Sequence, residues 1–146
     1  MGDRVIPAAL QGKAAQFIGS IDTPHTYTYM PDIGKALVTL GQHDEALGRA
    51  WHLPSPPTTT TRAWLEAIYA SAGQPFKVSV MPPLMVSGLS PFVPILRELK
   101  EMLYEFNEPH IMRHDAYAAA FGDHASSFET AVETTVRWYR DHHAAH

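Results

Sequence analysis

The spacing of apolar residues limits the choice of fold more than any other feature of this chain. After position 61, apolar side chains recur three or four positions apart: Trp64, Leu65, Ile68, Tyr69 and Ala72. This period predicts an amphipathic helix that ends at Gly73, with the threonines at 58–61 available to cap its first turn. Similar spacing marks residues 4–12, 31–41, 90–106 and 126–139. We therefore expect a mainly helical chain.

Residues that favour helix ends stand at the expected places. Pro31 and Asp32 suit a first helical turn that ends at Gly41, and Ser90-Pro91 suits another. Ser126 and Glu129 have the spacing of a capping box. In the helix that follows, we expect Trp138 to be mostly buried.

Short β-segments are expected in the remaining apolar stretches. Residues 14–19 and 25–30 bracket the turn 20–24 and predict a hairpin, and residues 49–53 predict another strand. Phe76, Val78 and Val80 alternate with polar residues, which predicts a strand with one buried face. Because helices outnumber these short strands, the predicted fold class is α+β, a small single domain over residues 1–146, rather than a doubly wound sheet.

Composition excludes several functional classes. The chain has 11 Lys+Arg against 15 Asp+Glu and a net charge of −4, so we expect no nucleic-acid partner. It has no cysteine, which removes disulfides, thiolate nucleophiles and Cys-type zinc sites. The long uncharged stretch between Lys77 and Arg97 holds four prolines, which argues against a membrane span. The N-terminus lacks a signal-peptide pattern, so a cytoplasmic location is expected.

Motifs for common enzyme chemistry are missing. No two of the nine glycines are spaced as in a dinucleotide-binding loop, and no lysine follows a tyrosine by four positions. Gly88-Leu89-Ser90 continues with proline rather than the turn of a nucleophile elbow. His110 and His114 could share a helix face as metal ligands, but a surface loop is the favoured interpretation. We therefore expect no catalytic residue, no metal and no cofactor, and specifically no binding of NAD(H) or NADP(H).

Several segments nevertheless resemble a known family. The segment HTYTYMPDIGKALVTL, the Ala-Trp-His-Leu segment, a loop of prolines and threonines, and the terminal FGDHASSFETAVETTVRWYRDH resemble the C-terminal half of the NAD-dependent epimerase/dehydratase family, the extended short-chain dehydrogenase/reductases. The resemblance covers nearly the whole chain. It implies a substrate-binding lobe whose Rossmann domain, with the glycine-rich loop and the catalytic Tyr and Lys, would lie before Met1.

The resemblance also implies a substrate pocket. In family members that use sugar nucleotides, an arginine on the aromatic strand contacts the phosphates, and His25 stands at the corresponding place. A neutral imidazole holds phosphate weakly beside a guanidinium, which argues against a nucleotide sugar. Tyr27, Tyr29 and Met81 would line the same pocket, with cross-strand packing and core filling as the alternative roles.

Two functions follow as hypotheses. The chain is a non-catalytic lobe that holds a small polar ligand, or it is an assembly module that forms a homodimer or higher oligomer. The second hypothesis expects apolar residues of the segment 80–94 and the region around Tyr27 and Tyr29 to face water. A hydrolase acting through His25 or His52 has no supporting pattern.

Overall fold

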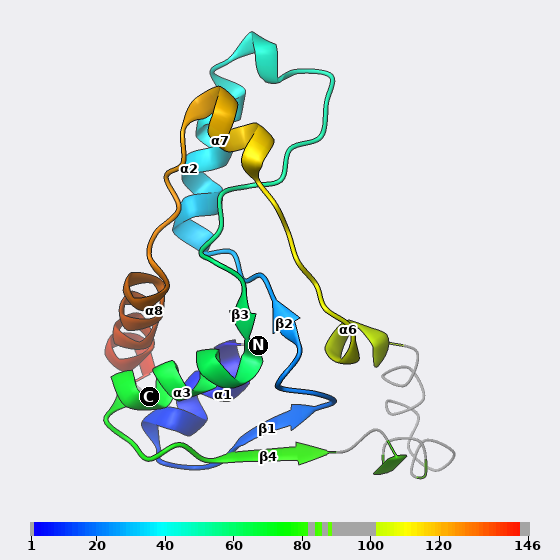
Figure 1. Ribbon diagram of the computed structural model, residues 1–146. Coiled ribbons are helices and arrows are strands. Elements are labelled where there is room, and N and C mark those ends of the chain that lie inside the picture. Colours follow the sequence, from blue (N-terminus) through cyan, green and yellow to red (C-terminus); the bar gives the residue numbers. More distant parts are fainter. Residues whose placement is uncertain (1, 82–83, 86–87, 89–101, 144–146) are drawn as a thin grey trace.

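In the computed structural model, some helices pack together into a body at one end of the molecule, and others belong to an arm at the opposite end (Figure 1). The structure describes residues 2–81, 84–85, 88 and 102–143. The body contains α1 (Gly2–Leu10), α3 (Thr61–Ala72) and α8 (Phe128–His143), beside strands β1 (Ala15–Ile18) and β4 (Val78–Met81). The arm contains α2 (Met30–Gly41), the 3-10 turn η1 (Asp44–Ala46) and α7 (Asp115–Phe121). The short helix α6 (Tyr104–Asn107) lies beyond β2 (Pro24–His25) and β3 (Thr59–Thr60).

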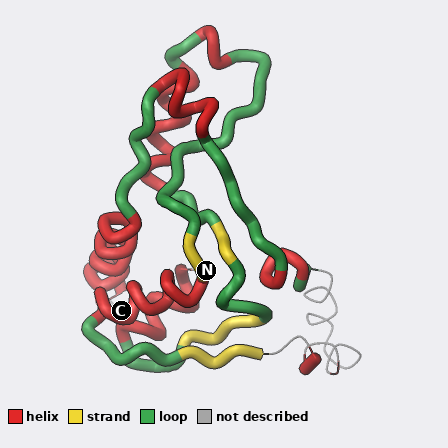
Figure 2. The backbone as a smooth tube through the Cα atoms, viewed as in Figure 1, coloured by secondary structure: helices red, strands yellow, loops and turns green. Residues whose placement is uncertain are grey.

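Figure 2 shows that strands are few and that long irregular segments join the helices. β1 pairs with β4 in parallel, with Ala15 opposite Val78 and Ile18 opposite Met81. β2 pairs with β3 in the antiparallel sense, and His25 forms an isolated bridge with His110. The predicted α+β class, mainly helical with a few short strands, is thus confirmed.

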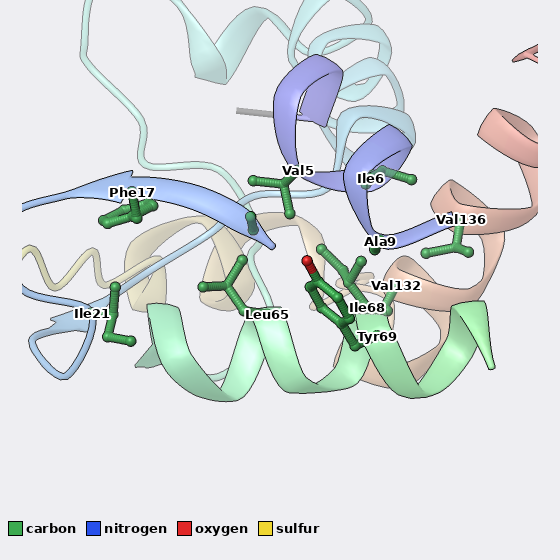
Figure 3. Packing of buried hydrophobic residues seen from close by; sticks show 11 residues of the cluster. Val5, Ile6, Ala9, Phe17, Ile21, Leu65, Ile68, Tyr69, Val132 and Val136 are labelled. Atoms are coloured by element: carbon green, nitrogen blue, oxygen red, sulfur yellow. The ribbon is translucent and has the colours of Figure 1, made fainter. Parts of the chain in front are cut away.

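The core of the body lies between α1, α3 and α8, with β1 along one side (Figure 3). Its members are Val5, Ile6, Ala9, Ala15, Phe17, Ile21, Leu65, Ile68, Tyr69, Val132 and Val136. The Tyr69 hydroxyl donates to the carbonyl of Lys13, which satisfies its only polar atom in this core. The periodic stripe of α3 therefore faces the core as predicted.

The arm has a separate aromatic cluster. The Trp51 ring lies 5.1 Å from that of Phe121, and the Phe121 ring lies 5.2 Å from that of Tyr117, which is fully buried. The Trp51 indole donates to the carbonyl of Ala46. The strand predicted over residues 49–53 is therefore wrong, because Trp51 is held by aromatic contacts and a turn carbonyl in an irregular segment.

The predicted hairpin is also wrong. The turn residues do not lead β1 back on itself, because Ile21 is buried in the core and its carbonyl accepts the Arg62 amide at the start of α3. Asp22 binds the Arg62 guanidinium through both carboxylate oxygens, at 2.6 and 3.0 Å. The segment 25–30 thus turns away from β1, and only Pro24 and His25 pair with β3.

Three finer predictions need correction. Trp138 is 52% exposed, so it is not a core residue. Val80 is 38% exposed, which contradicts its place on a buried strand face and agrees with the exposure that the assembly hypothesis expects. Ser127, not Ser126, caps α8, since the Ser127 hydroxyl accepts the Thr130 amide. The predicted helix over 90–106 lies mostly outside the described residues, which show only its last part as α6.

The other helix ends agree with the sequence. Thr60 caps α3 by accepting the Ala63 amide, and Gly73 ends it with φ +72°. Pro31 stands in the first turn of α2, beside Asp32. Among the described residues, no helix is long and apolar enough to cross a membrane.

Candidate functional site

A cleft of about 500 Å³ lies between the β2 region and the segment that contains α6. Its described lining comprises Phe17, His25, Tyr27, Thr61, Tyr104, Glu105, Phe106, Glu108, Pro109 and His110. We call it the His25 cleft. Its volume is within the range of small-molecule sites.

The two walls are joined by backbone hydrogen bonds between distant parts of the chain. The His110 amide donates to the carbonyl of Pro24, and the Thr26 amide donates to the carbonyl of His110, both at 2.9 Å. Gly19, with φ +81°, allows α6 to approach β1, because a β-carbon at Gly19 would lie 2.7 Å from Cβ of Phe106. The Asn107 side-chain oxygen also accepts the Ser20 amide. These contacts fix the distance between the walls.

His25 is fixed by both ring nitrogens. Nδ1 lies 3.0 Å from the carbonyl oxygen of Thr23, and Nε2 lies 2.6 Å from that of Glu105. A carbonyl only accepts hydrogen bonds, so a neutral ring donates to one of the two and a protonated ring donates to both. In either form, both nitrogens at the ring edge are occupied by backbone carbonyls.

Four rings follow one another across the cleft wall: Trp64, Tyr27, His25 and His110. We call them the ring row. Successive centroids are 5.5, 6.2 and 6.4 Å apart, with interplanar angles of 17°, 33° and 23°. The four rings therefore have similar tilts, and three of them, all except Trp64, line the cleft.

Tyr27 is held in its neutral form. Burial raises the pKa of Tyr27, and the hydrogen bond with the Thr61 hydroxyl, at 2.6 Å, opposes this rise only in part. At neutral pH the phenol is therefore neither a base nor a nucleophile. It is suited to packing and to orienting a ligand.

The structure brings together only two of the four predicted pocket residues. His25 and Tyr27 line the cleft, whereas Tyr29 and Met81 are not among its described lining residues. The carbonyl of Tyr29 accepts the Asp32 and Ile33 amides at the start of α2. Met81 pairs with Ile18 at the end of the parallel strands.

Sequence reasoning missed the opposite wall, formed by residues 104–110. This segment reaches the cleft through long-range contacts, among them the bridge of His110 to His25 and the bond of Asn107 to Ser20, and no local pattern encodes such contacts. His110 and His114 do not share a helix face, because residues 109–114 are not helical. His114 instead faces the Asp123 carboxylate at 3.4 Å. Within the described residues, no three potential metal ligands lie together.

A second cleft of about 440 Å³ lies beside the start of α8. Near it, the Asp32 carboxylate is fully buried and accepts the amide and the hydroxyl of Ser126, at 2.7 and 2.9 Å. Arg113 and Asp115 form an ion pair at this cleft. Because these polar groups are already paired with one another, this cleft is the weaker candidate.

Comparison with known proteins gives a similarity of fold. No family model matches the sequence, and no curated protein matches it. Among solved structures, a dTDP-glucose 4,6-dehydratase from Bacillus anthracis, in complex with NAD, matches with a TM-score of 0.70 and 14% identity. The match covers 96% of this chain and 39% of that chain, so the chain spans about two fifths of the dehydratase. The α+β fold described above is therefore one that part of this dehydratase also has.

Proposed function

We propose that the chain is a non-catalytic ligand-binding lobe, and that the His25 cleft is its binding site. The observation that carries this proposal is the cleft itself, where two distant segments form a cavity of suitable size lined by fixed aromatic rings. The lobe would correspond to the C-terminal, substrate-binding half of the epimerase/dehydratase family. The fold similarity supports the likeness to this family, and the correspondence to its C-terminal half rests on the sequence resemblance alone.

The residues favour binding over chemistry. The 146 residues contain no glycine-rich dinucleotide loop and no Tyr-x-x-x-Lys pair. In the cleft, Tyr27 stays neutral and the His25 nitrogens contact backbone carbonyls. Neither side chain is thus placed to take a proton from a ligand.

Nuclear magnetic resonance can test this proposal with a panel of small hydroxylated, amine and carboxylate compounds. We expect saturable shifts at His25, Tyr27 and His110 for at least one compound. Deleting the exposed ring with His110→Ala should weaken that binding, while His142→Ala, which removes an exposed ring on α8, should not. Shifts confined to other surfaces, or none in the whole panel, would contradict the proposal.

A titration with NAD(H) tests the cofactor part separately. We expect no saturable heat in calorimetry, because the sequence offers no loop of glycines at a helix N-terminus. Micromolar affinity would contradict the expectation that no cofactor binds.

Self-association is the second candidate, and the outer face of α2 favours it. Met30, Leu37 and Val38 on this helix are 73%, 58% and 59% exposed. Of the surface predicted for assembly, Tyr27 and Tyr29 are half-buried, whereas Val80, Leu84 and Met85 are exposed; most of 80–94 lies outside the described residues.

Sedimentation equilibrium tests this candidate. If α2 pairs with a second copy, Leu37→Asp should shift the chain toward the monomer, whereas Trp138→Asp, at an exposed apolar position on α8, should not. A wild-type chain that stays monomeric at high concentration excludes this candidate.

A further inference from the structure

Among the described lining residues of the His25 cleft, the formally charged groups all have one sign. Of its described lining residues, Glu105 and Glu108 carry the formal charges, and none is lysine or arginine. Both glutamates are exposed, and neither forms an ion pair with a described residue. An anionic ligand would therefore meet two carboxylates without a compensating cation.

The hydrogen-bond donors of the cleft are also mostly used. Both nitrogens of His25 contact carbonyl oxygens, and the Tyr27 hydroxyl is paired with Thr61. Phosphate and carboxylate groups are bound by N–H donors and by guanidinium or ammonium groups. The cleft thus lacks the usual partners of an anion among its described residues.

What the cleft does present is a set of aromatic side chains. Phe17, Tyr27, Tyr104 and Phe106 line it together with the two histidines. The faces of phenyl and phenol rings are electron-rich and attract a cation, and the attraction is larger where water is displaced. Carboxylates beside such faces add to the same preference.

From this lining we infer that the His25 cleft binds a small organic cation with an apolar body, such as a quaternary or tertiary amine, in preference to neutral or anionic molecules. This inference rests on the proposed function, since it names the ligand class of the same cleft. The apolar body would lie against the ring faces, and the positive charge would be shared between the rings and the two carboxylates.

Three probes of nearly equal shape test the inference. Choline is cationic, 3,3-dimethylbutan-1-ol is its neutral carbon analogue, and 3,3-dimethylbutanoate is a similar anion. All three probes are measured in the same buffer, so that the comparison isolates the charge of the ligand. We expect choline to bind about tenfold more tightly than the alcohol, from cation–π attraction and the carboxylates, and the anion to bind most weakly.

Charge-removing variants locate the effect. The double variant Glu105→Gln, Glu108→Gln keeps the Glu105 backbone carbonyl that holds His25, and it should reduce the preference for choline over the alcohol. Glu133→Gln makes the same change on an exposed position of α8 and should leave that preference unchanged. Circular dichroism melts check that each variant remains folded.

The outcomes separate the two proposals. Equal binding of choline and the alcohol, or tightest binding of the anion, overturns the inference about charge but leaves the cleft as a binding site. Failure of all three probes overturns the inference. If the broader compound panel also fails, the proposed function is overturned as well.

Discussion

At the scale of single residues, the exposed fraction of a side chain can differ from what the helical period predicts, as it does for Trp138. Trp138 occurs in a helix with a clear apolar stripe, yet Val132 and Val136 occupy the buried face and the Trp138 ring stacks on His142 at 4.3 Å. A period of 3.6 fixes which residues share a face, but a large aromatic residue beside the stripe can lie on either side of its edge. The neighbouring helices decide the outcome, and the sequence of one helix does not contain them.

Trp138→Ala should therefore be a mild substitution. We expect it to lower the free energy of unfolding by at most about 1 kcal/mol, as for other surface positions. Leu65→Ala, in the fully buried core, should cost about 2–5 kcal/mol. Urea unfolding of both variants measures the difference, and similar losses would place Trp138 in the core after all.

The Tyr27 hydroxyl gives a pH dependence with a definite sign. Burial raises the pKa of Tyr27 above that of an unfolded tyrosine, so the folded state favours the neutral phenol. The resulting stabilisation is complete below the ordinary tyrosine pKa and is lost as the pH rises through the raised value. Stability should therefore begin to fall as the pH rises through about 10, the ordinary tyrosine pKa, and continue to fall until the pH passes the raised pKa of Tyr27.

Tyr27→Phe should reduce this alkaline loss. Burial also raises the pKa of Tyr69, so the variant should retain part of it. Denaturant unfolding at several pH values, with Tyr104→Phe at an exposed phenol as the control, measures the effect. If Tyr27→Phe loses as much stability at alkaline pH as the wild type, the alkaline loss comes from groups other than Tyr27.

At the scale of elements, the helices could be predicted and the strand pairing could not. The ends of α2 and α3 follow from Pro31, Thr60 and Gly73, which act within one turn of the chain. The partner of β1 is β4, about sixty positions later, and β2 pairs with β3 and bridges to His110. Local turn residues favour a hairpin, but the burial of Ile21 and its bond to Arg62 override them.

For the same reason only half of the candidate site was foreseen. His25 and Tyr27 stand in a segment with a recognisable aromatic pattern. The opposite wall, from Tyr104 to His110, has no such pattern, and its place depends on contacts with β2 and Gly19.

The start of α8 offers a test of side-chain roles within one element. Ser127→Ala removes the cap of the Thr130 amide and should cost about 1 kcal/mol. Ser126→Ala leaves the buried Asp32 carboxylate with one bond fewer and should cost about 1–3 kcal/mol. Glu129→Ala should stay within about 0.5 kcal/mol, because the predicted capping box is not formed. Thermal unfolding measures these changes, and a large loss of stability for Glu129→Ala would show that the predicted capping box does form.

At the scale of the whole molecule, we expect the body and the arm to differ in local stability. The body has the larger core, whereas the arm depends on one aromatic cluster. In the arm and the segment after it, the Tyr117 hydroxyl and Nε2 of His124 are buried without a hydrogen-bond partner among the described residues. Such groups lower stability, so we expect the arm to open before the body.

Hydrogen exchange measures this order directly. Amides of α7 should exchange faster than those of α3, which packs in the main core. Trp51→Ala should accelerate exchange in α2 and α7 while changing α3 little. Equal acceleration in α3 would show that the molecule unfolds as one cooperative unit.

The bridge between His25 and His110 has a thermodynamic consequence for any ligand of the cleft. Because the two walls come from segments about eighty positions apart in the chain, the unfolded chain has no binding site, and occupancy is linked to global folding. A ligand at a hundred times its dissociation constant should then stabilise the fold by about 2.7 kcal/mol. A rise in melting temperature with ligand concentration thus reports occupancy without a label, and it requires both walls of the cleft to be in place.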